Sequence, residues 1–101
     1  KEMIKHIVFW KLKDTAHGND KATNARMIKE KLEDLGGKIE GLNKIEVGID
    51  ILGGANYDVA LYSELDSVEA LDFYQNHPLH QALLPFVREA VEDRKALNYE
   101  F

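Results

Sequence analysis

Residues Tyr57–Glu69, "YDVALYSELDSVE", combine a strand with the start of a helix and decide the fold. Every second residue from Tyr57 to Leu65 falls on one face, and this alternation is typical of a strand. Asp66 can accept hydrogen bonds from the free N–H groups of a helix start, and Glu69, three residues later, completes the pattern of a capping box. The stretch therefore predicts a strand over 57–65 that leads into a helix capped by Asp66.

A second strand precedes this one along the chain. Residues Ile45–Ile51, "IEVGIDI", alternate strictly, with the aliphatic side chains on one face. Gly53, Gly54 and Asn56 follow, and these residue types favour a turn. Two alternating segments joined by a short turn predict an antiparallel hairpin.

The helix after Asp66 is predicted to end near Asn76, because the residue before a proline resists helical angles. Pro78 suits the first turn of another short helix, and Pro85 is predicted to interrupt or restart that helix. The last residues, Arg94–Phe101, read "RKALNYEF" and predict a terminal strand. The expected inner face of the first of these helices consists of Val68, Leu71 and either Phe73 or Tyr74.

A strand and a helix are predicted in the first third of the chain. Met3–Leu12, "MIKHIVFWKL", has apolar side chains in both alternating sets, so this strand needs cover on both faces. Apolar residues at three- and four-residue steps then predict an amphipathic helix over 21–35. The loop "DTAHGND" supplies a cap at its end, and Gly36-Gly37 stops the helix.

The predicted order of strand, helix, strand, strand, broken helix and strand is the α+β arrangement called ferredoxin-like, or split βαβ. Its antiparallel four-stranded sheet carries the helices on one face and leaves the other face open. Because an open apolar face is a liability in a monomer, we expect a homodimer whose sheets pack face to face through it. The apolar candidates for this open face are Ile7, Phe9, Ala60, Tyr62 and Ala96.

Composition narrows the class of protein. The chain has 101 residues, which suits a single domain over residues 1–101, and it has a net charge of −5 and no cysteine. A negative chain with scattered basic residues lacks the basic face that nucleic-acid binding needs. The lack of cysteine excludes disulfides and thiolate chemistry within this chain, and no apolar run is long enough to span a bilayer. We expect a cytoplasmic protein with no nucleic-acid or membrane partner.

Two segments resemble one known family. Residues 3–14, "MIKHIVFWKLKD", resemble the opening of the stress-responsive dimeric α/β-barrel family, also called Dabb, and residues 57–81, "YDVALYSELDSVEALDFYQNHPLHQ", resemble its central stretch. The second segment contains a Tyr-x-x-His-Pro-x-His element, which is fairly specific when it is combined with "IKH" in the first strand. The resemblance covers nearly the whole chain. It implies a ferredoxin-like monomer and a dimer whose two sheets close into a barrel.

The resemblance also implies candidate site residues. Many family members are small stress-associated proteins without an assigned reaction, whereas a plant member is a polyketide cyclase that uses neither metal nor cofactor. The pattern of that cyclase matches its tyrosine to Tyr74, its catalytic histidine to His80 and its strand histidine to His6. The cyclase has a further histidine in its third strand, and this chain has Val59 there, which implies a less polar pocket.

The stretch "FYQNHPLH", Phe73–His80, supports three interpretations. As catalytic residues, His80 would act as a general base and Tyr74 would donate a hydrogen bond to a developing oxyanion. As metal ligands, His77 and His80 would need a third ligand such as His6, and the stretch lacks the glutamate of the familiar zinc helix. As structural residues, His77 would hydrogen-bond a free backbone group at the helix junction, and Tyr74 would belong to the core.

We expect a small dimeric protein that binds an apolar or aromatic molecule in a cavity between the sheet and the helices. One alternative is a cofactor-free, cyclase-like enzyme with Tyr74 and His80 as catalytic residues, and another is a dimeric scaffold without a ligand. No metal or cofactor is expected, and His17, in a polar loop, is expected to be solvated. The residues predicted to contact the ligand are His6, Trp10, Val59, Tyr74 and His80.

Overall fold

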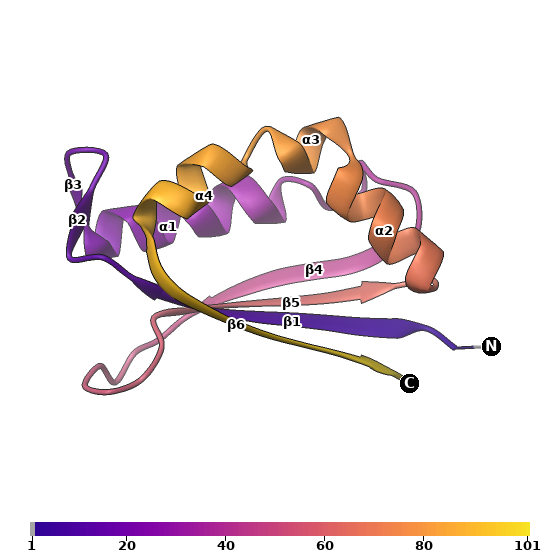
Figure 1. Ribbon diagram of the computed structural model, residues 1–101, viewed down its shortest axis with the longest axis horizontal. Helices are drawn as coiled ribbons and strands as arrows, with labels where there is room; N and C mark the ends of the chain where they lie inside the picture. The colour runs from indigo at the N-terminus through magenta and orange to yellow at the C-terminus, as the bar shows by residue number, and fades with distance from the viewer. Residues whose placement is uncertain (1) are drawn as a thin grey trace.

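The structure is a computed structural model that describes residues 2–101 (Figure 1). Its main elements occur in the predicted order, and a short two-stranded hairpin precedes the first helix within the predicted loop. The elements are β1 Ile4–Leu12, β2 Thr15–Ala16, β3 Asn19–Asp20, α1 Lys21–Glu33, β4 Leu42–Ile49, β5 Val59–Leu65, α2 Val68–Asn76, α3 Pro78–Gln81, α4 Leu84–Ala90 and β6 Val91–Glu100.

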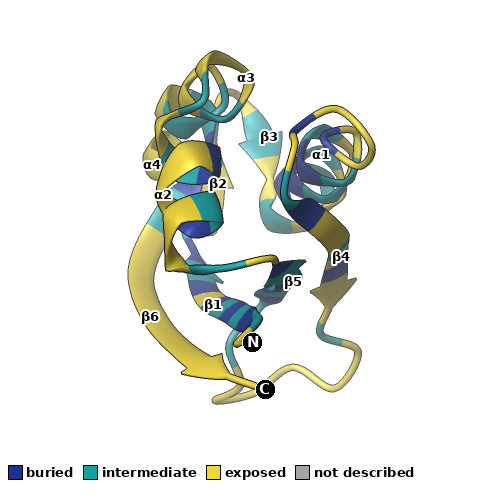
Figure 2. Ribbon diagram, turned by 90° about the vertical axis from the view of Figure 1, so that its right-hand side faces the viewer, coloured by how far each residue is buried: buried dark blue, intermediate teal, exposed yellow. Residues whose placement is uncertain are grey.

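Four strands form one antiparallel sheet in the order β4-β5-β1-β6. The helices all lie on one face of this sheet (Figure 1). Figure 2 shows α1 above the β4 side of the sheet and α2 and α4 above the β1 and β6 side. The predicted α+β, ferredoxin-like architecture is confirmed.

The central strand β1 sets which side chains point toward the helices. Ile4, His6, Val8, Trp10 and Leu12 are all buried, and the residues between them are intermediate or exposed. The four apolar residues among them meet the inner side of α1 in one core, because Ala25, Ile28 and Leu32 on that helix are buried at three- and four-residue steps. The helix face of the sheet therefore carries the core that the first-strand pattern predicted.

The register corrects one residue of the predicted open face. Ala96 lies opposite Val8, and Val8 is buried beneath the helices, so Ala96 points to the helix side of the sheet. Phe9 does face away from the helices, opposite Ala60 on β5 and Lys95 on β6. The pairing of β6 with β1 could not be read from the sequence, and a one-residue difference in register reverses the face of every side chain.

The start of α2 also differs from the prediction. Ser67, not Asp66, is the N-cap, and its side chain accepts a hydrogen bond from the Ala70 N–H at 3.0 Å. With Ser67 as the cap, Glu69 is the second helical residue and not the third, so no capping box forms. The Asp66 carboxylate instead accepts a hydrogen bond from the Asn43 side chain at 2.7 Å.

The inner face of α2 is formed by Leu71 and Tyr74, which are three residues apart and both buried. Phe73 is 51% exposed, because a residue two positions from Leu71 lies on nearly the opposite side of a helix. Val68, in the first turn, is 61% exposed. The prediction was therefore right for Leu71 and wrong for Val68, and of the two alternatives Phe73 and Tyr74 it is Tyr74 that lies on the inner face.

His17, in the turn of the β2–β3 hairpin, contacts Phe86 on α4. The His17 ring stacks on Phe86 with the centroids 4.1 Å apart, and its Nε2 hydrogen-bonds the Phe86 carbonyl oxygen at 2.9 Å. His17 is exposed, as predicted, but it also joins two elements that are distant in sequence. Asp20, at the end of the hairpin, caps α1 by accepting a hydrogen bond from the Thr23 N–H at 2.8 Å, which confirms the predicted cap.

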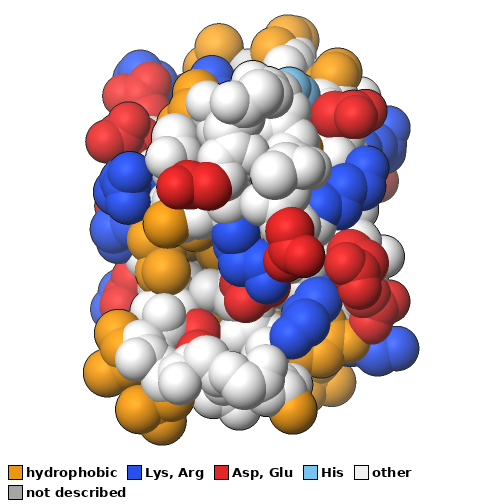
Figure 3. All heavy atoms as spheres, turned by 90° about the vertical axis from the view of Figure 1, so that its left-hand side faces the viewer, with side chains coloured by type: hydrophobic (Ala, Val, Ile, Leu, Met, Phe, Trp, Pro, Cys, Tyr) orange, Lys and Arg blue, Asp and Glu red, His pale blue; other side chains and the backbone are white. Residues whose placement is uncertain are grey.

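The open face of the sheet is rich in exposed apolar side chains, including Phe9, Leu97 and Tyr99. The loop between β4 and β5 projects beyond the same side of the sheet (Figure 1), and its residues Ile51 and Leu52 are 91% and 82% exposed. Figure 3 views the end of the molecule at which the β4–β5 loop lies: charges of both signs are interleaved across its middle, and hydrophobic side chains gather along its lower edge.

No helix within residues 2–101 is long and apolar enough to cross a membrane.

Candidate functional site

A cavity of about 560 Å³ lies between the helix face of the sheet and the helices. Three of the predicted contact residues, His6, Trp10 and His80, line it. The full lining comprises His6, Val8, Trp10, Leu32, Leu61, Asp72, Gln75, Asn76, His80, Gln81, Leu83, Leu84, Val87, Arg88 and Arg94. A cavity of this volume is in the range that holds a small organic molecule.

His6 is held in one orientation by its neighbours on the sheet. Its ring Nδ1 lies 2.6 Å from the side-chain oxygen of Asn98, which is directly opposite on β6. On the other side, the Ser63 hydroxyl donates to the His6 backbone oxygen at 3.0 Å. Because the amide oxygen accepts, Nδ1 carries the proton of the neutral ring, and Nε2 keeps its lone pair. Burial lowers the pKa of His6, so this neutral form predominates at neutral pH.

His80 has the same arrangement of ring nitrogens. Its Nδ1 lies 3.0 Å from the Gln75 backbone oxygen, which can only accept, so Nδ1 carries the proton and Nε2 is the basic atom. Burial lowers the pKa of His80, the hydrogen bond to Gln75 acts in the opposite direction, and the charges of His6 and Arg88 lower the pKa further. The side chain is therefore a neutral base at neutral pH.

The helix junction explains how His80 reaches this position. His77 ends α2 with an extended backbone, ψ 137°, as expected for a residue before proline. Its Nδ1 accepts a hydrogen bond from the Leu79 N–H at 3.1 Å and so caps α3, which starts at Pro78. This confirms the predicted structural role of His77. The chain turns at the junction and brings the His80 ring back against Tyr74.

Tyr74 lies in the core beside both histidines. It is fully buried, and its ring centroid is 4.6 Å from that of His80 and 6.3 Å from that of His6. Its hydroxyl is the one buried side-chain polar atom without a hydrogen-bond partner among residues 2–101. Burial raises the pKa of this hydroxyl, so it stays protonated and able to donate. Tyr74 is not among the residues that line the cavity.

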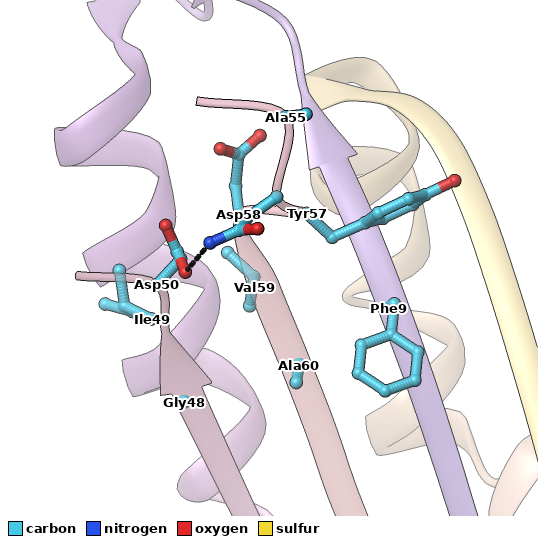
Figure 4. Close-up of a pocket in the computed structure, with 10 residues that line it drawn as sticks. Phe9, Gly48, Ile49, Asp50, Ala55, Tyr57, Asp58, Val59 and Ala60 are labelled. Atoms are coloured by element: carbon cyan, nitrogen blue, oxygen red, sulfur yellow. Dashed lines mark hydrogen bonds between the residues drawn. The ribbon is translucent and has the colours of Figure 1, made fainter. Parts of the chain in front are cut away.

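Val59 does not line this cavity either. It is buried on β5 opposite Trp10 and borders a different hollow of about 600 Å³ beside the β4–β5 loop. Figure 4 shows this hollow, with Phe9 and Ala60 on the strands and Asp50 at its edge. The Asp50 carboxylate accepts a hydrogen bond from the Asn56 side chain at 3.1 Å. The acidic groups here support the loop.

Asp50 illustrates this supporting role, because its carboxylate accepts from the backbone N–H groups of Leu52 and Gly53 at 3.1 and 2.6 Å. Asp58 likewise accepts from the Leu12 N–H at 2.7 Å. These carboxylates already have protein donors, so the hollow is less suited than the first cavity to binding a polar ligand.

Among the lining residues that the sequence did not predict are two arginines, Arg88 on α4 and Arg94 on β6. Arg94 lies opposite Trp10 in the sheet, which places both on the helix side. The alternation of β6 would have marked Arg94 only if its register with β1 had been known. Arg88 follows the buried Val87, and no motif distinguishes it.

The metal interpretation of the two histidines has little geometric support. The Nδ1 atom of His77 accepts a hydrogen bond from the Leu79 N–H, whereas the Nδ1 atom of His80 hydrogen-bonds the Gln75 carbonyl oxygen. Both atoms are therefore engaged with different backbone groups. Within the described residues 2–101, no three His, Cys, Asp or Glu side chains are grouped closely enough to hold a metal ion.

An antiparallel four-stranded sheet with its helices on one face defines an α+β protein of the ferredoxin-like class. A family model described as the stress responsive A/B barrel domain, Dabb, matches residues 4–101, and the chain belongs to this family. The resemblance noted in the sequence is thereby confirmed.

Similar proteins include several without an assigned function. An uncharacterized protein of Streptomyces coelicolor is 36% identical over 88 residues, which cover 86% of this chain and 89% of that protein. A dimeric protein of unknown function with a ferredoxin-like fold, from Bacteroides fragilis, is 39% identical with a TM-score of 0.87, and the match covers 98% of this chain and 96% of that one. A hydroxynitrile lyase from Passiflora edulis shares the fold at 24% identity and a TM-score of 0.75, with 99% and 94% covered.

Proposed function

We propose that this protein is a homodimer in which each protomer binds a small aromatic molecule in the cavity between the sheet and the helices. The observation that carries the proposal is the lining of this cavity. Trp10 supplies an aromatic surface, and His6 and His80 supply ring nitrogens whose Nε2 atoms make no hydrogen bond within residues 2–101. A mostly preformed cavity with a few fixed polar groups is the usual form of a small-molecule site.

The dimer part of the proposal is supported by the open face of the sheet. Phe9, Leu97 and Tyr99 are 41%, 58% and 44% exposed on it, which is costly for a monomer in water. The Bacteroides fragilis relative is dimeric. Packing of two such faces about a two-fold axis would bury these side chains and close the two sheets into a barrel.

Magnetic resonance provides a direct test, because Trp10 is the only tryptophan and gives a single indole N–H signal. The probes are three two-ring aromatic compounds, 2-naphthol, 2-naphthamide and 2-naphthoate. Binding in the cavity is expected to shift the signals of Trp10, His6 and His80 and to leave that of His17 in place. If none of the three probes shifts the Trp10 signal at millimolar concentration, the proposed site is wrong.

A pair of substitutions makes this test specific to the cavity. Leu84→Phe adds volume to a lining residue and is expected to weaken binding of every probe. Leu79→Phe makes the same change in the neighbouring helix at a side chain that is 43% exposed and does not line the cavity. Equal binding by the two variants would place the ligand elsewhere.

The second candidate function is proton transfer in the same cavity, of the type used by cofactor-free cyclases. The favouring observation is the neutral His80, whose Nε2 is the free basic atom. In this reaction His80 would remove a proton from a carbon next to a carbonyl group. Tyr74 packs against His80 and lies outside the cavity lining, so its hydroxyl would donate to the enolate oxygen that develops only after the ring moves toward the cavity.

Hydrogen–deuterium exchange of 2-tetralone in D₂O tests the proton transfer without knowledge of the natural substrate. The protein is expected to accelerate exchange at the carbons next to the carbonyl group, and His80→Ala is expected to remove the acceleration while the protein stays folded. His17→Asn is the control, because His17 is exposed on the β2–β3 hairpin and does not line the cavity. Unchanged exchange in His80→Ala would refute the assigned base.

A further inference from the structure

The chain has three arginines, and two of them line the cavity. Arg88 comes from α4 and Arg94 from β6, so the fold brings together two guanidinium groups from separate elements. Both residues are exposed, whereas Trp10 and His6 are buried. The arginines therefore lie toward the mouth of the cavity and the aromatic and imidazole rings lie deeper.

Neither guanidinium has a protein partner. The ion pairs within residues 2–101 all involve lysines, for example Lys29 with Glu33 and Lys38 with Asp34, both at 2.8 Å. No hydrogen bond from the guanidinium of Arg88 or Arg94 to any described group is present, although each has five N–H donors. Two unpaired guanidinium groups at one opening are available to bind an external group.

The charge of the cavity lining is opposite in sign to that of the protein. The charged lining residues are Arg88, Arg94 and Asp72, and both histidines are neutral, so two positive charges and one negative charge leave the lining positive. The Asp72 carboxylate also accepts a hydrogen bond from the Asn76 side chain at 3.2 Å. The chain as a whole has a net charge of −5. The cavity lining is therefore a locally positive region on an acidic protein.

We propose that the ligand is a small aromatic carboxylate, with its acid group held at the cavity mouth by Arg88 and Arg94 and its ring against Trp10. This inference rests on the proposed function and adds the chemical class of the ligand. A carboxylate matches the planar guanidinium group, because its two oxygens can accept two parallel N–H bonds. The unprotonated Nε2 atoms of His6 and His80 then face the apolar end of the ligand or a polar substituent on it.

The test compares two ligands that differ in charge and hardly in shape, 2-naphthoate and 2-naphthamide, by titration calorimetry. Arg94→Gln and Arg88→Gln are each expected to weaken naphthoate binding about threefold to tenfold, since partly exposed charge pairs contribute modestly. Naphthamide binding is expected to change less than twofold. The matched control is Arg26→Gln, which removes the remaining arginine on α1, outside the cavity.

Salt provides a second, independent readout. An increase from about 0.05 M to about 0.5 M salt is expected to weaken naphthoate binding to the wild-type protein and to leave naphthamide binding unchanged, because salt screens exposed charges. In the double variant lacking both cavity arginines, naphthoate binding is expected to lose this salt dependence.

The outcomes separate this inference from the proposed function. If both ligands bind equally and neither arginine substitution distinguishes them, the carboxylate assignment is overturned and the small-molecule site stands. If neither ligand binds, the carboxylate assignment is overturned, and if 2-naphthol also leaves the Trp10 signal in place, the proposed function fails with it. A stronger loss in Arg26→Gln than in Arg94→Gln would place the anion outside the cavity and also overturn the inference.

Discussion

The His80 ring packs against the Tyr74 ring, with centroids 4.6 Å apart and ring planes inclined by 49°. The two residues are separated by the His77-Pro78 junction, which ends one helix and starts another. In an uninterrupted helix, residues 74 and 80 would lie about 120° apart around the axis and about 9 Å apart along it. The junction is therefore what allows a core tyrosine and a cavity histidine to share one environment.

The unpaired hydroxyl of Tyr74 leads to the first prediction. Tyr74→Phe removes a buried polar group that has no partner among residues 2–101, and it preserves the ring that packs against His80. We expect the free energy of unfolding to stay the same or rise by up to about 1 kcal/mol, because an unsatisfied buried group is destabilising. Urea denaturation measures this change.

The control is Tyr57→Phe, because the Tyr57 hydroxyl donates a hydrogen bond to Asp93. That substitution is expected to lower stability, in contrast to Tyr74→Phe. A loss above about 1 kcal/mol in Tyr74→Phe would mean that the hydroxyl has a partner in solution. If the hydroxyl serves the proposed proton transfer, Tyr74→Phe also slows exchange of 2-tetralone, so stability and activity change in opposite directions.

The lowered pKa values of His6 and His80 predict a pH dependence of stability. As pH falls below the unfolded-state value of 6.5, the unfolded chain binds protons before the folded protein does, so the free energy of unfolding decreases. The decrease continues until the pH passes the lowered folded-state values, and it is absent well above 6.5. Urea denaturation between about pH 5 and 7.5 measures it.

A double variant isolates the two histidines. His6→Gln with His80→Gln is expected to flatten the dependence between about pH 5 and 7. Carboxylates contribute at lower pH, because groups such as Asp50, which accepts backbone N–H bonds from Gly53, have pKa values below their ordinary range. A wild-type slope in the double variant would contradict the prediction.

Much of the fold could be predicted because local signals and hydrophobic alternation agreed. The alternation within β1 and the proline at 78 are properties of short segments, and both were interpreted correctly. Two details could not be predicted in this way. The face on which Ala96 lies depends on the pairing of two distant strands, and the choice of Ser67 over Asp66 as the cap depends on the backbone angles of a single residue.

In the candidate site, too, the sequence predicted the residues that a local motif marks and missed those that depend on contacts between distant segments. His6, Trp10 and His80 were predicted to lie together, and they line one cavity. Arg88 and Arg94 were missed, since no motif marks an arginine whose position depends on the register of the last strand. Val59 and Tyr74 remain predicted contact residues that lie beside the cavity lining and not in it.

The open sheet face predicts where the dimer can be disrupted. Phe9→Lys places a charge in the middle of this face, and a charge buried without a partner is strongly unfavourable. We expect the dimer dissociation constant to rise by about a hundredfold or more, measured by sedimentation equilibrium at micromolar concentration.

Phe73→Lys is the matched control for the dimer test, because Phe73 is 51% exposed but lies on α2, on the helix side of the sheet. It is expected to leave the dimer intact. Dissociation by Phe73→Lys and not by Phe9→Lys would move the interface to the helices, and a monomeric wild-type protein would refute the dimer itself.

The last prediction concerns the approach of α2 to the chain before β4. Gly41 has a φ of +87°, and a Cβ atom added there would lie 2.8 Å from the Cβ of Ala70 on α2. Gly41→Ala therefore combines left-handed backbone strain with a steric clash, and we expect it to lower the free energy of unfolding by about 2–4 kcal/mol. Gly37→Ala separates the two effects, because Gly37 has a φ of +78° and no atom within 4 Å of its added Cβ. Its cost is expected to be about 1 kcal/mol. Equal losses in thermal or urea denaturation would mean that α2 shifts to accept the extra methyl group, and that the close packing at Gly41 contributes little to the stability of the fold.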